Sequence, residues 1–152
     1  MQNENTMRVL NTLISINNER IEGYETALKE TKEYDLKPIF KQFISNSQTC
    51  KSELVQEVSK LGGAESKRTK NSGKFFRVWM DIKATLAGNE RRALLNSCEF
   101  GEDEAQEDYN EVLETASRYL SEQQQTMIIN QKCLLKSDYI HVRILSNASI
   151  YA

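Results

Sequence analysis

Four segments of this chain repeat apolar residues every three or four positions, which is the spacing of one face of an α-helix. The first stripe consists of Met7, Leu10, Ile14, Asn17, Ile21, Tyr24 and Leu28. The pattern predicts long helices over residues 3–31, 35–61, 90–117 and 119–147. A chain with four such stripes buries them by bundling the helices against one another. We therefore predict an all-α four-helix bundle.

Turn and breaker residues support these boundaries. Pro38 stands where the first turn of the second helix tolerates proline, and Gly62 and Gly63 stand where that helix is expected to end. The whole chain holds one proline and six glycines, and 28% of its residues are charged, as is typical of long-helix proteins. Its 152 residues are enough for one domain, which we expect to span 1–152.

The link between the second and third long helices is the longest in the chain. Its second half places Phe75, Trp79, Ile82 and Leu86 at helical spacing, which predicts a short amphipathic helix over residues 74–87. The other two links are short, so each joins an antiparallel hairpin. Two hairpins joined by a long crossover are the ferritin-like arrangement of four-helix bundles. An up-down-up-down bundle remains open, because a folded-back short helix would also fill the link.

Several polar residues fall close to the centre of an apolar stripe when residues are placed 100° apart. These are Asn17 and Glu25 on the first helix, Ser47 and Cys50 on the second, Glu102 on the third, and Gln131, Asp138 and His141 on the fourth. Glu22 and Glu99 fall on the flanks. An inward acid needs a cation, a hydrogen-bond donor or water. In the crossover arrangement, Glu25, Asp138 and His141 converge on one region, with Glu22, Glu99 and Glu102 as further candidates there.

The order of four segments identifies a family resemblance. The segments LNTLISINNERIEGYETA, FKQFISNSQTCKSELVQEVSKLGG, FFRVWMDIKATLAG and ALLNSCEFGEDEAQEDYNEVLE together resemble a family of uncharacterised bacterial ferritin-like proteins. The resemblance covers roughly residues 7–145. It implies a ferritin-like four-helix bundle with a short extra helix in the crossover between the second and third long helices, and it brings no established activity.

Ferritin-like proteins often hold two metal ions with one Glu on each of two helices and Glu-x-x-His on each of the other two. Carried over to this chain, that pattern assigns Glu22 or Glu25, Glu99 or Glu102, and the pair Asp138 and His141. The second helix lacks Glu-x-x-His, so Gln48 or Cys50 would have to substitute. The chain has one histidine, which argues against a symmetric two-metal centre. The predicted metal ligands are therefore Glu25, Glu102, Asp138 and His141, holding a single iron, manganese or zinc ion.

Each of these residues also has an ordinary structural interpretation. Glu22 and Glu25 suit a charged flank that pairs with Arg20 or Lys29, and His141 suits a core histidine bonded to a carboxylate. Asn17 and Gln131 are placed to hydrogen-bond each other across the core. Tyr24 and Tyr109 are mainly core aromatics that can reach an inward carboxylate.

Composition excludes several classes of function. No basic face of the kind that binds nucleic acid is present, and no apolar run approaches the roughly 18 residues of a membrane span. Cys50, Cys98 and Cys133 form no C-x-x-C pair and indicate reduced thiols in a cytoplasmic protein, with Cys50 and Cys98 in the core. We expect a bundle that is able to bind metal at a single or degenerate site and that has no established catalysis, so its status as an enzyme stays open. The alternative is a metal-free structural or stress-associated interaction module. The oligomeric state is left open with a homodimer as one candidate, and a protein partner is not specified.

Overall fold

The computed structural model describes residues 2–66 and 91–150, with the last two as backbone only. Its long helices are α1 (Gln2–Glu30), α2 (Lys37–Lys60), α4 (Arg91–Thr115) and α5 (Glu122–Ile150). Two short 3₁₀ turns, η1 (Tyr34–Leu36) and η2 (Ser117–Tyr119), precede α2 and α5. No β-strand occurs in the described part of the chain, so the predicted all-α class is confirmed. The short helix predicted over residues 74–87 lies outside the described residues.

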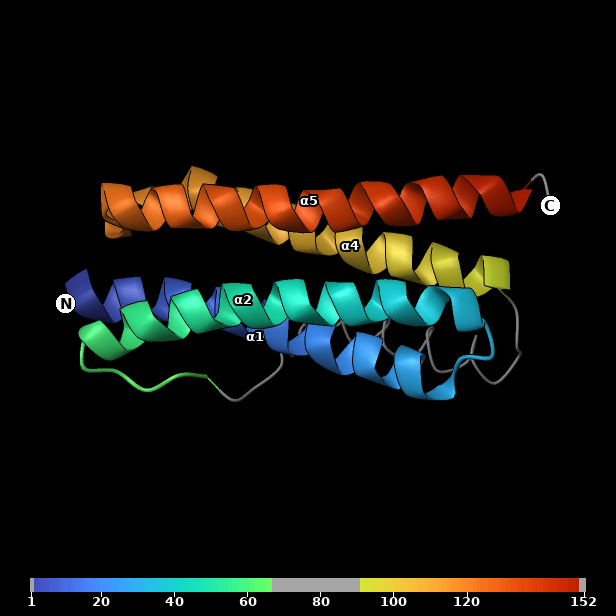
Figure 1. The fold of residues 1–152 in the computed structure, drawn as a ribbon. Helices are drawn as coiled ribbons and strands as arrows, with labels where there is room; N and C mark the ends of the chain where they lie inside the picture. Colours follow the sequence, from blue (N-terminus) through green and yellow to red (C-terminus); the bar gives the residue numbers. More distant parts are fainter. Residues whose placement is uncertain (1, 67–90, 151–152) are drawn as a thin grey trace.

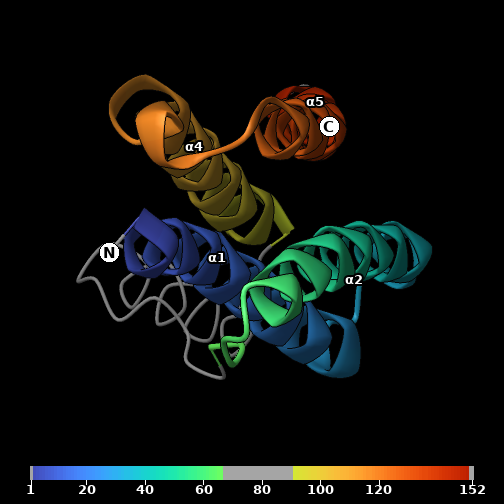
Figure 2. The ribbon, with the colours of Figure 1, turned by 90° about the vertical axis from the view of Figure 1, so that its left-hand side faces the viewer.

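The four helices form two antiparallel pairs laid one on the other. In Figure 1, α1 and α5 run from left to right, whereas α2 and α4 run in the opposite direction. Seen from the end in Figure 2, α4 lies above α1 and α5 lies above α2. Contacts join α1 to α2, α4 to α5, α2 to α5 and α1 to α4. The end of α2 and the start of α4 lie at opposite ends of the bundle.

Local signals explain where the helices begin and end. Gly62, the residue after the Leu61 C-cap of α2, has φ of +79°, a left-handed conformation that suits glycine at a helix C-terminus. At the start of α5 the amide of Gln124 donates to Ser121 Oγ at 3.0 Å, and the Ser121 amide donates to Gln124 Oε1 at 3.0 Å. This reciprocal pair is a capping box. It starts α5 at Glu122, three residues later than the pattern of apolar residues suggested.

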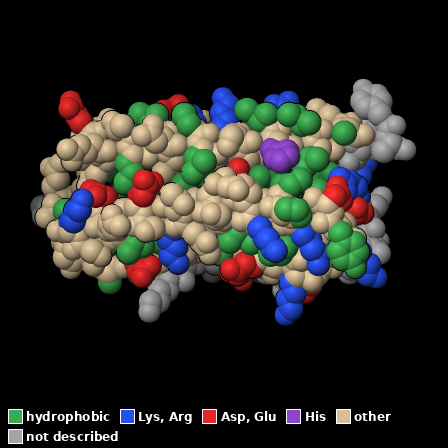
Figure 3. Space-filling model, in the orientation of Figure 1, with side chains coloured by type: hydrophobic (Ala, Val, Ile, Leu, Met, Phe, Trp, Pro, Cys, Tyr) green, Lys and Arg blue, Asp and Glu red, His purple; other side chains and the backbone are tan. Residues whose placement is uncertain are grey.

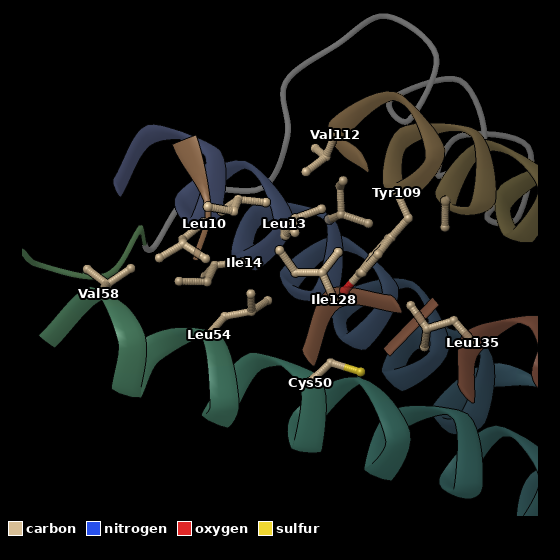
Figure 4. Packing of buried hydrophobic residues seen from close by; sticks show 13 residues of the cluster. Leu10, Leu13, Ile14, Cys50, Leu54, Val58, Tyr109, Val112, Ile128 and Leu135 are labelled. Atoms are coloured by element: carbon tan, nitrogen blue, oxygen red, sulfur yellow. The ribbon is translucent and has the colours of Figure 1, made fainter. Parts of the chain in front are cut away.

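The apolar core consists of two clusters placed one after the other along the bundle. The first, drawn in Figure 4, gathers residues from all four helices, including Leu13, Leu54, Tyr109 and Leu135. The second cluster lies toward the η1 end and includes Tyr24, Phe43, Cys98 and Val142. Tyr24 packs against Phe40 in a tilted contact and against Phe43 in an edge contact, with ring centroids at 5.4 and 5.1 Å. Each long helix contributes residues to both clusters, and a short stretch of the bundle lies between the two clusters.

The buried face of α1 differs from the predicted stripe. Its buried residues include Leu13, Asn17, Arg20, Tyr24 and Ala27, whereas Ile21 and Leu28 are only partly buried. The centre of the face is therefore rotated by about one residue from the predicted position. This rotation brings Arg20 into the core and moves Glu25 out of it.

Membrane insertion has no candidate segment in the structure. None of the described helices combines the length and the apolar character that crossing a bilayer requires.

Candidate functional site

One polar residue from each helix occupies the level between the two apolar clusters. The four are Arg20 of α1, Ser47 of α2, Glu102 of α4 and Asp138 of α5, with exposed fractions of 6, 0, 1 and 4%. On every helix the polar residue is flanked at three or four positions by members of the apolar clusters, such as Cys98 and Ala105 around Glu102. The centre of the bundle is thus a polar layer between two apolar ones.

Arg20 connects the other members of this polar layer. Its Nε and Nη2 atoms donate to Glu102 Oε1 at 3.0 and 2.7 Å. Nη2 also donates to Asp138 Oδ2 at 3.1 Å, and Nη1 donates to Ser47 Oγ. The guanidinium therefore holds contacts to all three other helices. A buried cation needs such compensation, because an unpaired charge in the interior costs several kcal/mol, on the order of 3–5 when one partner is removed.

The two oxygens of Glu102 have very different surroundings. Oε1 accepts two hydrogen bonds from Arg20 and a third from the Tyr24 hydroxyl at 2.6 Å. Oε2 is buried and accepts no hydrogen bond from the residues that the structure describes. Three donors directed at one oxygen are the arrangement expected for an ionised carboxylate beside a cation. The prediction that Tyr24 reaches an inward carboxylate is confirmed.

Asp138 is held from two sides. Its Oδ2 accepts from Arg20, and its Oδ1 accepts from Asn46 Nδ2 of α2 at 2.8 Å. Asn46 is oriented by a hydrogen bond from Gln42 Nε2 to its Oδ1 at 2.9 Å. Burial raises the pKa of Asp138 to about 6, against the opposing effect of Arg20. Asp138 is therefore the member of the layer whose charge changes just below neutral pH.

The same surroundings raise the pKa of two other groups, Arg20 and Tyr24. Burial by itself lowers the pKa of Arg20, but the fields of Glu102, Tyr24 and Asp138 outweigh it and raise that pKa. Burial and the negative charge of Glu102 raise the pKa of Tyr24 well above its usual value. Arg20 is therefore permanently charged, and Tyr24 remains a neutral hydrogen-bond donor.

A second network, built mainly from neutral side chains, lies one to two helical turns away. Asn17 Nδ2 donates to the Tyr109 hydroxyl at 2.9 Å, and that hydroxyl donates to Gln131 Oε1 at 2.9 Å. Gln131 Nε2 in turn donates to the carbonyl of Cys50 at 3.2 Å and to Glu53 Oε1 at 3.0 Å. Asn17 and Gln131 are therefore coupled across the core as expected, but through the Tyr109 hydroxyl rather than directly.

The structure brings together two of the four predicted metal ligands. Glu102 and Asp138 both lie in the polar layer, where Arg20 stands between them. The inward orientation predicted for Glu25 and His141 is wrong, because both side chains are exposed. Glu25 follows the rotation of α1, and His141 lies at the edge of α5 with its ring 6.0 Å from that of Phe43. The histidine is visible as the purple side chain on the surface in Figure 3.

The flanking candidates lie outside the polar layer as well. Glu22 and Gln48 are exposed, and Glu99 is half-buried with its Oε1 3.5 Å from Arg143 Nε. Within residues 2–66 and 91–150, no group of three or more His, Cys, Asp or Glu side chains is arranged to hold a metal ion. Metal binding by Glu25, Glu102, Asp138 and His141 remains a prediction.

Arg20 is the residue of the site that sequence reasoning placed elsewhere. It was expected as a surface partner of Glu22 or Glu25, but it is buried and pairs with Glu102 and Asp138. Its position was visible as a second seam on the first helix, formed at alternating four- and three-residue steps by Leu13, Asn17, Arg20, Tyr24 and Ala27. A charged residue inside such a seam, facing acids on other helices, is the signal for a buried ion pair.

Cys50 and Cys98 lie in the core as predicted, and none of the three cysteines belongs to the polar layer. Cys50 and Cys98 are buried and unoxidised, and Cys133 is exposed. Burial raises the pKa of both Cys50 and Cys98 to about 12, so neither thiol ionises near neutral pH. An unionised thiol is a poor nucleophile and a poor metal ligand.

Comparisons with known proteins place the chain in a family without assigning an activity. The comparison with curated protein sequences gives no match. A family model does match residues 5–115, which include nearly all of α1 and the whole of α2 and α4, with Arg20, Ser47 and Glu102. Asp138 lies on α5, beyond the matched residues. On that match, the chain belongs to the family described as domain of unknown function DUF2383.

Proposed function

We propose that this protein is a non-catalytic helical bundle of ferritin-like descent in which Arg20 supplies the central positive charge that a metal ion supplies in metal-binding relatives of that fold. It would then act as a structural or interaction module through its outer surface. The observation that carries the proposal is the guanidinium of Arg20, which contacts Glu102 at 2.7 Å and Asp138 at 3.1 Å. The helix directions in Figure 1 and the family resemblance support the ferritin-like descent.

The chemistry of the polar layer favours an arginine over a metal ion. Glu102 Oε1 and both oxygens of Asp138 already accept hydrogen bonds from Arg20, Tyr24 and Asn46. A two-metal centre would need further carboxylates and histidines from neighbouring helices. The donor atoms present do not fit such a centre.

A single metal ion held by Glu102 and Asp138 is the alternative proposal. Its support is Glu102 Oε2, a buried carboxylate oxygen that accepts no hydrogen bond from the described residues. Two carboxylates suit iron, manganese or zinc, but any such ion would lie close to the permanent charge of Arg20.

Elemental analysis distinguishes the two proposals. Purified protein is analysed as isolated, and again after anaerobic addition of Fe(II), Mn(II) or Zn(II) and removal of unbound ions. The proposal of a metal-free module predicts that no stoichiometric metal is bound under any of these conditions. One metal per chain that is lost in Glu102→Ala but kept in Glu25→Ala would establish the single-metal alternative. The exposed Glu25 is the matched control, because its replacement removes an acid without touching the polar layer.

The cellular location belongs to the same proposal. A cytoplasmic protein of bacteria is what the family resemblance and the three unpaired cysteines favour. Fractionation of cells that express the protein would test it.

A further inference from the structure

The outward faces of α4 and α5 carry charges of opposite sign, arranged in two neighbouring stripes. We define the acidic stripe as Asp103, Glu107, Glu111 and Glu114 of α4 with Phe100. We define the apolar–basic stripe as Ile129, Cys133, Lys136, Ile140, Arg143 and Ile144 of α5. Along the top of Figure 3, several hydrophobic side chains lie at the surface over α5, with basic side chains among them. Both stripes expose large apolar side chains, and each carries charges of a single sign, neither of which folding of the bundle requires.

The apolar–basic stripe exposes large side chains that the core does not use. Ile129, Ile140 and Ile144 are 47, 46 and 62% exposed. Between residues 123 and 148 the only acidic side chain is Asp138, which is buried in the polar layer. The exposed surface of this stretch is therefore apolar and basic, a combination that favours an acidic partner.

The acidic stripe provides such a partner within the same molecule. No lysine or arginine occurs between residues 93 and 117, whereas Glu107, Glu111 and Glu114 are exposed there. Phe100 is also 51% exposed. Like charges repeated along one helix repel one another, so this face gains when it meets basic side chains.

Contacts between α4 and α5 fix the relative height of the two stripes. Arg143 lies opposite Glu99, and the Tyr139 hydroxyl donates to Asp103 at 3.1 Å. Phe100 is therefore at the level of residues 140–144. In the same way, Gln106 donates to the carbonyl of Lys132, which sets Glu107 within about one turn of Lys136.

We propose that the α4–α5 face is the interface of a homodimer whose two-fold axis runs parallel to the helices. This axis places α4 of each copy over α5 of the other and preserves every residue's height along the bundle. Phe100 of one copy then meets Ile140 and Ile144 of the other, and Glu107 meets Lys136. A two-fold axis perpendicular to the helices would instead lay the acidic stripe on its own copy, which repulsion disfavours. The inference concerns the outer surface and is independent of the proposed role of Arg20.

The available area suffices for such an assembly. A face two helices wide and as long as α4 covers about 40 by 20 Å, or roughly 800 Å² per copy, which is the size of a standard stable interface. Two copies of each apolar and charged contact form at once, because the interface is isologous.

A charge exchange tests the arrangement. Sedimentation velocity should find a dimer for the full chain, and Lys136→Glu or Glu107→Lys alone should weaken dimerisation by at least tenfold. An equimolar mixture of the two variants should recover dimers, because a heterodimer of the two has opposite charges at both contacts between positions 107 and 136. Lys41→Glu and Glu25→Lys, exposed positions on α2 and α1, are the matched controls and should leave the dimer unchanged.

A disulfide test distinguishes this packing from direct pairing of α5 with α5. In a Cys133→Ser background, Phe100→Cys combined with Ile144→Cys should give an interchain disulfide on mild oxidation. In the parent chain, Cys133 should not link to Cys133, because the two α5 helices lie apart across the axis. A monomer at all concentrations, a dimer unaffected by either charge reversal, or efficient Cys133–Cys133 linkage would each overturn the proposal. So would binding of the monomer to anionic vesicles or to another acidic protein through Lys136 in place of dimerisation.

Discussion

Arg20 directs two hydrogen bonds at a single oxygen of Glu102, from Nε at 3.0 Å and from Nη2 at 2.7 Å, across the interface between α1 and α4. The same guanidinium reaches Asp138 on α5 and Ser47 on α2. The only cation of the polar layer is therefore also its only group in contact with all three other helices. Changes at Arg20 should affect the bundle as a whole.

Removal of that cation should destabilise the fold strongly. In Arg20→Ala, two buried carboxylates lose their compensating charge, so we expect a loss of about 3–5 kcal/mol in the free energy of unfolding, measured by chemical denaturation. Arg8→Ala, an exposed change on the same helix, should cost less than about 0.5 kcal/mol. The triple variant Arg20→Met, Glu102→Gln, Asp138→Asn should recover most of the loss. A mild effect of Arg20→Ala alone would contradict the central place given to this residue.

Asp138 should give the stability an unusual dependence on pH. Its pKa is about 6 in the folded protein, above the value of an unfolded aspartate, so the folded state binds the proton more readily. Its contribution to stability therefore increases as the pH falls from 7 toward 4. Relative to Asp138→Asn, the parent protein should gain about 1–2 kcal/mol over that range, measured from denaturation curves at three pH values.

Asp35 is the matched control for this titration. Its hydrogen bonds with Arg91 lower its pKa, so its contribution to stability is lost on acidification. Comparison with Asp35→Asn should accordingly show a pH effect of the opposite sign. The same sign for both aspartates would rule out the assigned environment of Asp138.

The Tyr24 hydroxyl should stabilise the buried carboxylate of Glu102, to which it donates a hydrogen bond. Tyr24→Phe keeps the ring between Phe40 and Phe43 but removes a hydrogen bond to the buried Glu102 carboxylate. Because hydrogen bonds to charged groups are the stronger ones, we expect a cost of about 1.5–3 kcal/mol by thermal or chemical denaturation. Tyr34→Phe, at a side chain that is 75% exposed, should be close to neutral. Equal effects of the two changes would contradict the geometry.

The turn after α2 offers a test of backbone conformation. A Cβ added at Gly62 has no atom within 4 Å, so its cost comes from the φ of +79° and not from a collision. Gly62→Ala should therefore cost about 1 kcal/mol, and Gly62→Asn less, because asparagine tolerates this conformation. Gly63→Ala differs, since its Cβ would collide with the flexible Met7 side chain. A neutral Gly62→Ala in chemical denaturation would show that the turn relaxes.

The four long helices were predictable because their apolar spacing records burial directly. The stripe on α2 contains Phe40, Phe43, Ser47, Cys50, Leu54 and Val58, and each of these residues is buried in the structure. The boundary at Gly62 was equally readable. The start of α5 was not found, because the capping box of Ser121 and Gln124 carries no apolar signal.

The candidate site was only half predictable. Glu102 and Asp138 stand at the centre of their own stripes, so their inward position followed from each helix alone. Glu25 was misplaced because the stripe on the first helix is broad, and an error of one residue in its centre rotates the face by about 100°. That rotation is decided by packing against α2 and α4, where Arg20 donates hydrogen bonds to Ser47 and Glu102.

Local periodicity thus specified the helices, their approximate lengths and the acids that face inward, because each depends on residues near one another in the chain. The cation that neutralises those acids is Arg20, which lies 82 positions from Glu102 and 118 positions from Asp138 along the chain. Such pairings have no periodic trace, since they arise only when the packing of four helices sets the rotation and height of each. The tertiary structure therefore decided that Arg20 lies between the carboxylates of Glu102 and Asp138, and it placed the acidic and apolar–basic stripes side by side.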